Sequence, residues 1–291
     1  MNKLKLSFVM LLWGSIGVFT RYINVSPILL AFLRALIAVP SLYIFHRINK
    51  SQSEFNIKRL IPFIISGCIL GLAWVCLFTA FKNTSISIAL LVYNMCPVYV
   101  LISAPIILKE RLSKIQIATV AGAFLGLLII VSSAINAKDF NLTGLGFGIV
   151  SGLLYASLVF INRIVKTEFD SSTITLIQMV SASIVLLPFV ISEGQLMFID
   201  KLSSVSILFI FILGFIHTGI AYNLYFSTYK KLSAVTIVSY SYLEPVFGII
   251  LSVVILGELI SINQIIGGIL ILGSTYFENI LGNLKNIQGK S

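Results

Sequence analysis

The sequence predicts an all-α integral membrane protein with ten transmembrane helices, arranged as two inverted repeats of five helices. Three observations lead to this prediction: the composition, a series of long uncharged runs, and a similarity between the two halves of the chain. Of the 291 residues, 58% are hydrophobic and only 10% are charged, whereas a soluble domain carries about 25% charged residues. So few charges could not cover a water-facing surface, and the high hydrophobicity excludes a disordered chain.

Ten apolar runs follow one another along the chain, most of them near the length of about 20 residues that a transmembrane helix requires. Their bounds are Leu6–Thr20, Tyr22–Phe45, Leu60–Phe81, Asn83–Leu108, Ile115–Ala137, Phe140–Asn162, Ser171–Ser192, Leu202–Tyr229, Leu232–Gly257 and Leu259–Phe277. Arg34 interrupts the second run, and Glu244 interrupts the ninth. The first run contains Trp13 and reaches Arg21 without a small-residue cleavage site, so we interpret it as a retained helix and not as a signal peptide.

The basic residues predict the orientation of these helices. If the N-terminus is cytoplasmic, fifteen Lys and Arg residues fall on the inner side and four on the outer side, as the positive-inside rule requires. The net charge of +10 then lies on the inner face, where it is an orientation signal and not a nucleic-acid-binding surface. We therefore expect a multi-pass protein of the cell (plasma) membrane with both termini in the cytoplasm.

An internal repeat divides the chain into two five-helix halves, residues 1–137 and 138–291. A shift of 148 residues aligns Gly71–Ile117 with Gly219–Ile265, and 14 of these 47 positions are identical. Because five is odd, the second half enters the membrane from the opposite side. Inverted repeats are typical of secondary transporters, in which the substrate site lies near the midplane between the repeats.

Several short segments of the chain resemble the EamA-type transporters of the drug/metabolite transporter superfamily. They are Trp13-Gly14-Ser15, Phe32-Leu33-Arg34-Ala35, Ala80-Phe81-Lys82-Asn83-Thr84-Ser85, Pro97, Glu110-Arg111, Glu244-Pro245-Val246, Gly257-Glu258 and Gln264-Ile265-Ile266-Gly267. The likeness covers both halves, and it implies ten helices, a central cavity and an exporter-like role. Members of this family handle amino acids, other metabolites and toxic compounds, so the resemblance does not identify the substrate. The two halves differ at Glu244, whose counterpart in the first half is Cys96.

Ten side chains inside the predicted helices are candidates for binding a substrate. They are Trp13, Arg34, Trp74, Tyr93, Asn94, Tyr155, His217, Tyr222, Tyr240 and Glu244. Aromatic side chains with a few polar groups are typical of pocket walls, but interfacial anchoring and helix–helix hydrogen bonds are alternative roles. His217 either relays protons or packs in the core. Tyr240 and Glu244 are four residues apart and would share one face of a helix.

The two charged candidates lie near the middle of their runs, where a charge is costly and marks either function or an ion pair. Arg34 and Glu244 therefore either contact the substrate or pair with each other or with backbone carbonyls. As a hypothesis, Glu244 binds a cationic or ammonium group of the substrate, or carries a coupling proton. Pro245 loosens the helix next to it, because proline has no backbone N–H.

Other prominent residues are expected to have structural roles. Glu110 and Glu258 lie at equivalent helix ends, and each is followed three positions later by a serine, so a capping or loop-fixing role is expected. The glycines of two helices are expected to be packing positions. These glycines are Gly122, Gly126, Gly144, Gly148 and Gly152.

The sequence thus favours a secondary active transporter that exports small metabolites, amino-acid-like or other small organic compounds. Import and proton coupling both stay open, because neither the direction nor the coupling ion can be inferred from sequence. A membrane enzyme would require clustered His, Asp or Glu, and an ATP-driven pump would require a phosphate-binding loop; neither pattern occurs. The expected partners are a small-molecule substrate, the lipid bilayer and protons, with no nucleic acid, cofactor or metal. The expected assembly is a monomer or a weak homodimer.

Overall fold

The computed structural model of the chain consists of helices and the turns that connect them. It describes residues 2–20, 22–48, 57–84, 89, 92–132, 141–165, 169–257 and 259–288, and every regular element in these ranges is helical. The α-helices are α1 (Asn2–Thr20), α2 (Pro27–Ile48), α3 (Ile57–Asn83), α5 (Cys96–Ile107), α6 (Lys114–Ser132), α7 (Leu142–Ile164), α8 (Ser171–Ser192), α9 (Ser204–Ile212), α10 (Ala221–Ser227), α11 (Ala234–Ser239), α12 (Leu243–Leu256) and α13 (Ile262–Gln288). The expected division between the two halves, at residues 137 and 138, lies outside the described residues.

Two of the long helices change their winding along their length. The π-helical segment η3 (Leu213–Ile220) joins α9 to α10, and the 3-10 turn η4 (Tyr240–Tyr242) joins α11 to α12. A third irregular element, the 3-10 helix η2 (Gln195–Lys201), follows α8. Because η4 ends just before α12, Pro245 lies in the first turn of that helix, where its missing N–H leaves no hydrogen bond unmade.

The helices have the length and polarity of membrane spans. Within the described residues, eight helical segments of at least 19 residues are apolar enough to cross a bilayer. The two remaining predicted spans contain shorter apolar helices, Cys96–Ile107 and Ile262–Tyr276. Large apolar side chains also point outward, such as Ile106 and Val254, which are 79% and 75% exposed. A surface of this kind suits lipid and not water, so the chain has the character of an integral membrane protein.

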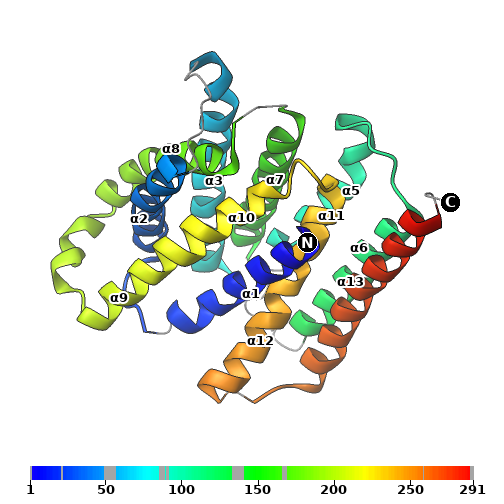
Figure 1. The fold of residues 1–291 in the computed structure, drawn as a ribbon. Coiled ribbons are helices and arrows are strands. Elements are labelled where there is room, and N and C mark those ends of the chain that lie inside the picture. Colours follow the sequence, from blue (N-terminus) through cyan, green and yellow to red (C-terminus); the bar gives the residue numbers. More distant parts are fainter. Residues whose placement is uncertain are drawn as a thin grey trace.

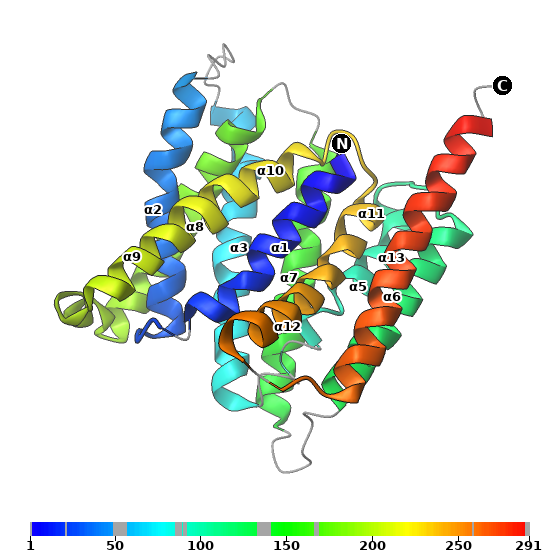
Figure 2. The ribbon, with the colours of Figure 1, turned by 60° about the horizontal axis from the view of Figure 1, so that its bottom comes forward.

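The helices pack in pairs that Figures 1 and 2 show from two directions. Helix α1 packs against α12 and α10, and helix α7 packs against α3 and α5. Helix α2 lies along α8 at one edge of the molecule, and α6 lies along α13 at the opposite edge. The described N-terminal end of α1 and the C-terminal end of α13 lie toward the same end of the molecule in Figure 2.

Two glycines bring helices α6 and α13 into backbone contact. A Cβ atom added to Gly126 would lie 2.6 Å from the carbonyl oxygen of Gly267, and one added to Gly267 would lie 2.4 Å from the carbonyl oxygen of Gly126. Both distances are shorter than a van der Waals contact, so only glycine fits at either position. The expected packing role of Gly126 is thereby confirmed.

The same two helices begin with the same hydrogen-bonded cap. The Ser113 hydroxyl accepts from the Gln116 N–H at 3.1 Å, and the Gln116 side chain accepts from the Ser113 N–H at 3.0 Å. Ser261 and Gln264 repeat this arrangement with distances of 3.2 Å and 2.8 Å. Each pair is a capping box, which satisfies backbone donors that have no partner inside the helix. Ser113 and Ser261, the serines three positions after Glu110 and Glu258, thus stand at the beginnings of helices.

Candidate functional site

A cluster of aromatic side chains surrounds Arg34, the one basic residue near the middle of a predicted span. The Arg34 side chain is half-buried on α2, and its guanidinium carbon lies 6.0 Å from the centre of the Trp74 ring. At this distance the charge is attracted to the face of the aromatic ring. The Arg34 Nε–H also donates to Thr218 Oγ1 at 3.2 Å. Helices α2 and α3 and the π-helical segment η3 therefore meet at this guanidinium.

Tyr222 connects the two tryptophans of the chain. Its ring lies 4.8 Å from Trp13 and 6.2 Å from Trp74, so residues of α1, α3 and α10 share one aromatic wall. Trp13 also donates its indole N–H to the His217 carbonyl oxygen at 3.0 Å. This wall is held by directed contacts as well as by burial.

Glu244, the acidic residue inside a predicted span, lies in the first turn of α12 and is half-buried. Its carboxylate lies close enough to Arg34 to interact with it electrostatically. Tyr93 and Tyr222 also lie within the range of this interaction. Among the described residues, however, it forms neither a hydrogen bond nor a direct ion pair. The two membrane-embedded charges thus lie in one cluster without neutralising each other by direct contact.

The other sequence-predicted candidates lie at different depths around this cluster. Tyr155 is buried on α7 and packs against the half-buried Tyr93 with 5.7 Å between ring centres. Asn94 is buried in the turn before α5, and Tyr240 is fully buried in η4 as part of the hydrophobic core. Tyr240 and Glu244 would share one face of a continuous α-helix, but the 3-10 turn η4 changes the rotation between them.

His217 is a buried residue of η3 with both ring nitrogens near polar atoms. Its Nε2 atom and the Ser15 hydroxyl are 2.8 Å apart, and its Nδ1 atom lies 3.4 Å from the Ile212 carbonyl oxygen. The ring also packs edge-on against Phe19 at 5.1 Å. These contacts hold α1 against η3, and they match the packing role that the sequence left open for this histidine.

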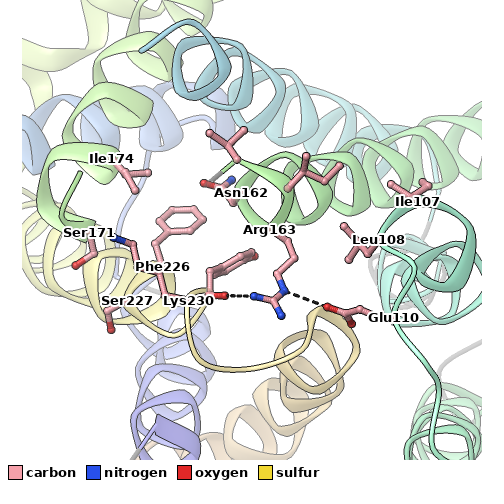
Figure 3. A pocket seen from close by; sticks show the side chains of 13 residues that line it. Ile107, Leu108, Glu110, Asn162, Arg163, Ser171, Ile174, Phe226, Ser227 and Lys230 are labelled. Carbon is pink, nitrogen blue, oxygen red and sulfur yellow. Dashed lines mark hydrogen bonds and ion pairs between the residues drawn. The ribbon is translucent and has the colours of Figure 1, made fainter. Parts of the chain in front are cut away.

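A cavity of about 720 Å³ lies beyond the aromatic cluster, at the ends of α5, α7 and α10. Figure 3 shows residues of its wall, which include Glu110, Asn162, Arg163, Phe226, Tyr229 and Lys230. The rings of Tyr222 and Tyr225 on α10, and of Tyr229 in the turn after it, follow one another toward this cavity, with ring centres 6.5 Å and 5.4 Å apart. An aromatic series thus joins the cluster around Arg34 to the cavity.

Arg163 holds three segments together at the cavity wall. Its Nε–H donates to Glu110 Oε1 at 3.0 Å, and its Nη1–H donates to the Tyr229 carbonyl oxygen at 2.8 Å (Figure 3). The loop-fixing role expected of Glu110 is thereby confirmed. The second carboxylate oxygen of Glu110, Oε2, is buried and has no hydrogen-bond partner among the described residues. Neither Arg163 nor the cavity is among the sites that the sequence predicts, although Arg163 aligns with Arg21 when the first helices of the two halves are compared at a shift of 142 residues.

Replacing Arg163 by alanine is expected to destabilise the protein by about 1–3 kcal/mol, because it leaves a largely buried carboxylate without its partner. The Glu110 side chain is only 16% exposed, so water cannot fully replace the lost partner. Thermal unfolding of the purified protein in detergent measures the effect. The Arg163→Lys variant keeps the positive charge and should lose less stability. Equal unfolding temperatures for Arg163→Ala and the parent protein would contradict this account of the ion pair.

Comparison with known proteins shows that the chain is similar to transporters. The model of the EamA-like transporter family matches residues 4–132 and 142–279. The chain is 29% identical to "Uncharacterized transporter YxxF" of Bacillus subtilis, over 99% of this chain and 91% of that protein. It is 24% identical to the "Probable amino-acid metabolite efflux pump" of Salmonella typhimurium, over 89% of this chain and 87% of that protein. The Escherichia coli protein of the same name is 22% identical, with coverage of 89% and 87%.

The fold also has a counterpart among solved structures. One crystal structure superposes on the chain with a TM-score of 0.82 and covers 96% of this chain and 98% of its own. Sequence identity between the two is 18%, so this likeness concerns the fold alone.

Proposed function

Because the chain belongs to the EamA-like transporter family, we propose that it is a secondary active transporter that exports small organic metabolites, amino-acid-like compounds among them. The observation that carries this proposal is the cluster of Arg34 and Glu244, two opposite charges inside apolar helices that do not pair directly. Unneutralised charges in a membrane are costly to maintain. A substrate that carries both an anionic and a cationic group would satisfy both of them.

The proposed export role rests on the relatives and on the site chemistry together. Two of the similar proteins are named as amino-acid metabolite efflux pumps, and an amino-acid-like compound carries the two charges that the cluster could bind. Trp13, Trp74 and Tyr222 would then contact the apolar part of the substrate. We further propose that Glu244 carries the coupling proton when substrate is absent.

The proposed architecture is that of ten spans in two inverted repeats, in the plasma membrane, with both termini cytoplasmic. The repeated capping boxes at Ser113 and Ser261 support this arrangement. Two helix pairs that occupy equivalent places in the two repeats, α1 with α12 and α7 with α5, support it as well. In this orientation the cavity beside Arg163 lies at the cytoplasmic end of the molecule. A metabolite would enter there and reach the Arg34 cluster along the aromatic residues of α10, and alternating access would release it outside.

A substrate screen tests the export proposal. Cells that express the chain, and cells that do not, are loaded with labelled amino acids and related metabolites, and efflux is followed together with resistance to toxic analogues. We expect faster efflux and higher resistance for at least one zwitterionic compound in the expressing cells. Uptake without efflux would show an importer instead, and a panel without any transport difference would contradict the proposed substrate class.

Gly14→Ala is expected to disturb the position of Glu244. A Cβ atom on residue 14 would lie 2.7 Å from the Glu244 carbonyl oxygen and 2.9 Å from the Gly248 nitrogen, so α1 and α12 would have to separate. Overpacking of this kind costs about 1–3 kcal/mol, and we expect both a lower unfolding temperature and slower efflux.

Gly17→Ala on the same helix is the matched control, because a Cβ atom there would meet no atom of the described residues within 4 Å. Thermal unfolding and the efflux assay are applied to both variants. If the two variants behave alike, the contact between α1 and α12 does not position Glu244.

A further inference from the structure

The π-helical segment η3 lies in the middle of the long helix from α9 to α10 and faces both α1 and α2. Within it, backbone hydrogen bonds span five residues, as between the Ala221 N–H and the Ile216 carbonyl oxygen. Such segments are rare, and they occur frequently at functional sites. In this chain the segment contacts two residues of the first half that line the proposed site, Trp13 and Arg34.

Thr218 makes the contact between η3 and the Arg34 side chain. It is fully buried, and its hydroxyl donates to the Leu213 carbonyl oxygen at 2.9 Å, five residues earlier. A hydroxyl has one hydrogen to donate, so its oxygen can only accept from the Arg34 Nε–H, which lies 3.2 Å away. The direction of both hydrogen bonds is therefore fixed by the π-helical backbone.

Backbone packing reinforces this contact. A Cβ atom on Gly214 would lie 2.6 Å from the Ile37 Cβ and 3.3 Å from the Arg34 carbonyl oxygen, so η3 touches the backbone of α2 next to Arg34. Thr218 thus meets a side chain whose own backbone cannot easily shift. The segment η3 therefore holds Arg34 at two points. Gly214 packs against its backbone, and Thr218 binds its guanidinium.

We infer that Thr218 is a positioning residue that orients Arg34 for binding an anionic group of the substrate. The Thr218 hydroxyl accepts from the Arg34 Nε–H, and within the described residues the two Nη groups of Arg34 form no hydrogen bond. They remain available beside Trp74 and Glu244 for a carboxylate, which arginine binds through two parallel hydrogen bonds. This inference rests on the proposed function, because it takes Arg34 as part of the substrate site.

The transport test compares two substitutions at residue 218. Thr218→Val keeps the shape of the side chain and removes the hydroxyl, whereas Thr218→Ser keeps the hydroxyl. For a zwitterionic compound found in the efflux screen, we expect Thr218→Val to raise the half-saturating concentration about fivefold to tenfold, the effect of one lost hydrogen bond. The maximal rate should change little, and Thr218→Ser should restore the parent value. A half-saturating concentration that Thr218→Val leaves unchanged would overturn the inference.

A spectroscopic test does not depend on transport. The chain has two tryptophans, so in a Trp13→Phe background the intrinsic fluorescence reports on Trp74, which lies against the Arg34 guanidinium. We expect Thr218→Val to change the Trp74 emission and Thr218→Ser to preserve it. Identical spectra for both variants would overturn the positioning role, even if no transported compound is found. If Thr218→Val does not fold, Thr218→Ala provides the same comparison with a smaller side chain.

Discussion

Glu244→Gln is expected to slow efflux of a zwitterionic substrate about tenfold to a hundredfold, because a hydrogen bond to a charged group contributes about 1.5–3 kcal/mol. The substitution keeps the size of the side chain and removes its charge. Since the carboxylate has no direct partner among the described residues, the loss should appear in transport and not in folding. Efflux from loaded cells, measured at several external pH values, gives the result.

Glu193→Gln is the matched control, because it makes the same chemical change at an exposed ion pair with Lys82. Exposed ion pairs contribute little to stability, so this variant should transport like the parent protein.

Substrates without a cationic group separate the two roles proposed for Glu244. If the carboxylate only binds an ammonium group, such substrates are exported equally by parent and variant. If it carries the proton, Glu244→Gln removes the pH dependence for every substrate, and an unchanged rate and pH profile would exclude both roles.

Gly267→Ala is expected to destabilise the protein by about 3 kcal/mol, the upper end of the usual cost of overpacking. The new Cβ atom would lie 2.4 Å from a backbone carbonyl oxygen of α6, and no rotamer change can relieve that contact. Thermal unfolding of the purified protein in detergent, followed by its elution profile, measures the effect.

The control lies on the same helix. Within the part of the chain that the structure describes, a Cβ atom on Gly273 would meet nothing within 4 Å, and alanine is favoured over glycine in a helix interior by about 1 kcal/mol. Gly273→Ala should therefore unfold at or above the parent temperature. Similar unfolding temperatures for the two variants would contradict the role of close approach between α6 and α13.

The sequence identified the membrane class and the charged centre of the candidate site. Arg34 and Glu244 could be found because a charge inside an apolar run is conspicuous, and Trp13, Trp74 and Tyr222 followed as aromatic residues at similar depth. These five side chains meet in one cluster that contacts and charge interactions connect. The number of long spans differs from the prediction within the described residues, where two of the ten predicted spans contain only short apolar helices.

Thr218 and Arg163 could not be selected in the same way. A threonine in an apolar helix is common, and its importance depends on a change to π-helical winding that composition does not reveal. Arg163 lies at a helix end, where a basic residue is ordinary, and its partners Glu110 and the Tyr229 carbonyl are distant in sequence. For Tyr240 the sequence predicts a relation that the structure changes. Regular helical spacing puts it on the same face as Glu244, but the 3-10 turn η4 lies between the two residues.

The contact between α6 and α13 has a mechanical consequence for the alternating access proposed above. The two helices touch backbone to backbone at Gly126 and Gly267, so we expect them to move together and not to slide past each other. Close-packed elements of this kind have discrete arrangements and deform little. The pair therefore serves as a rigid frame at one edge of the molecule, and the free energy of substrate binding can act on the helices that surround Arg34 and Glu244.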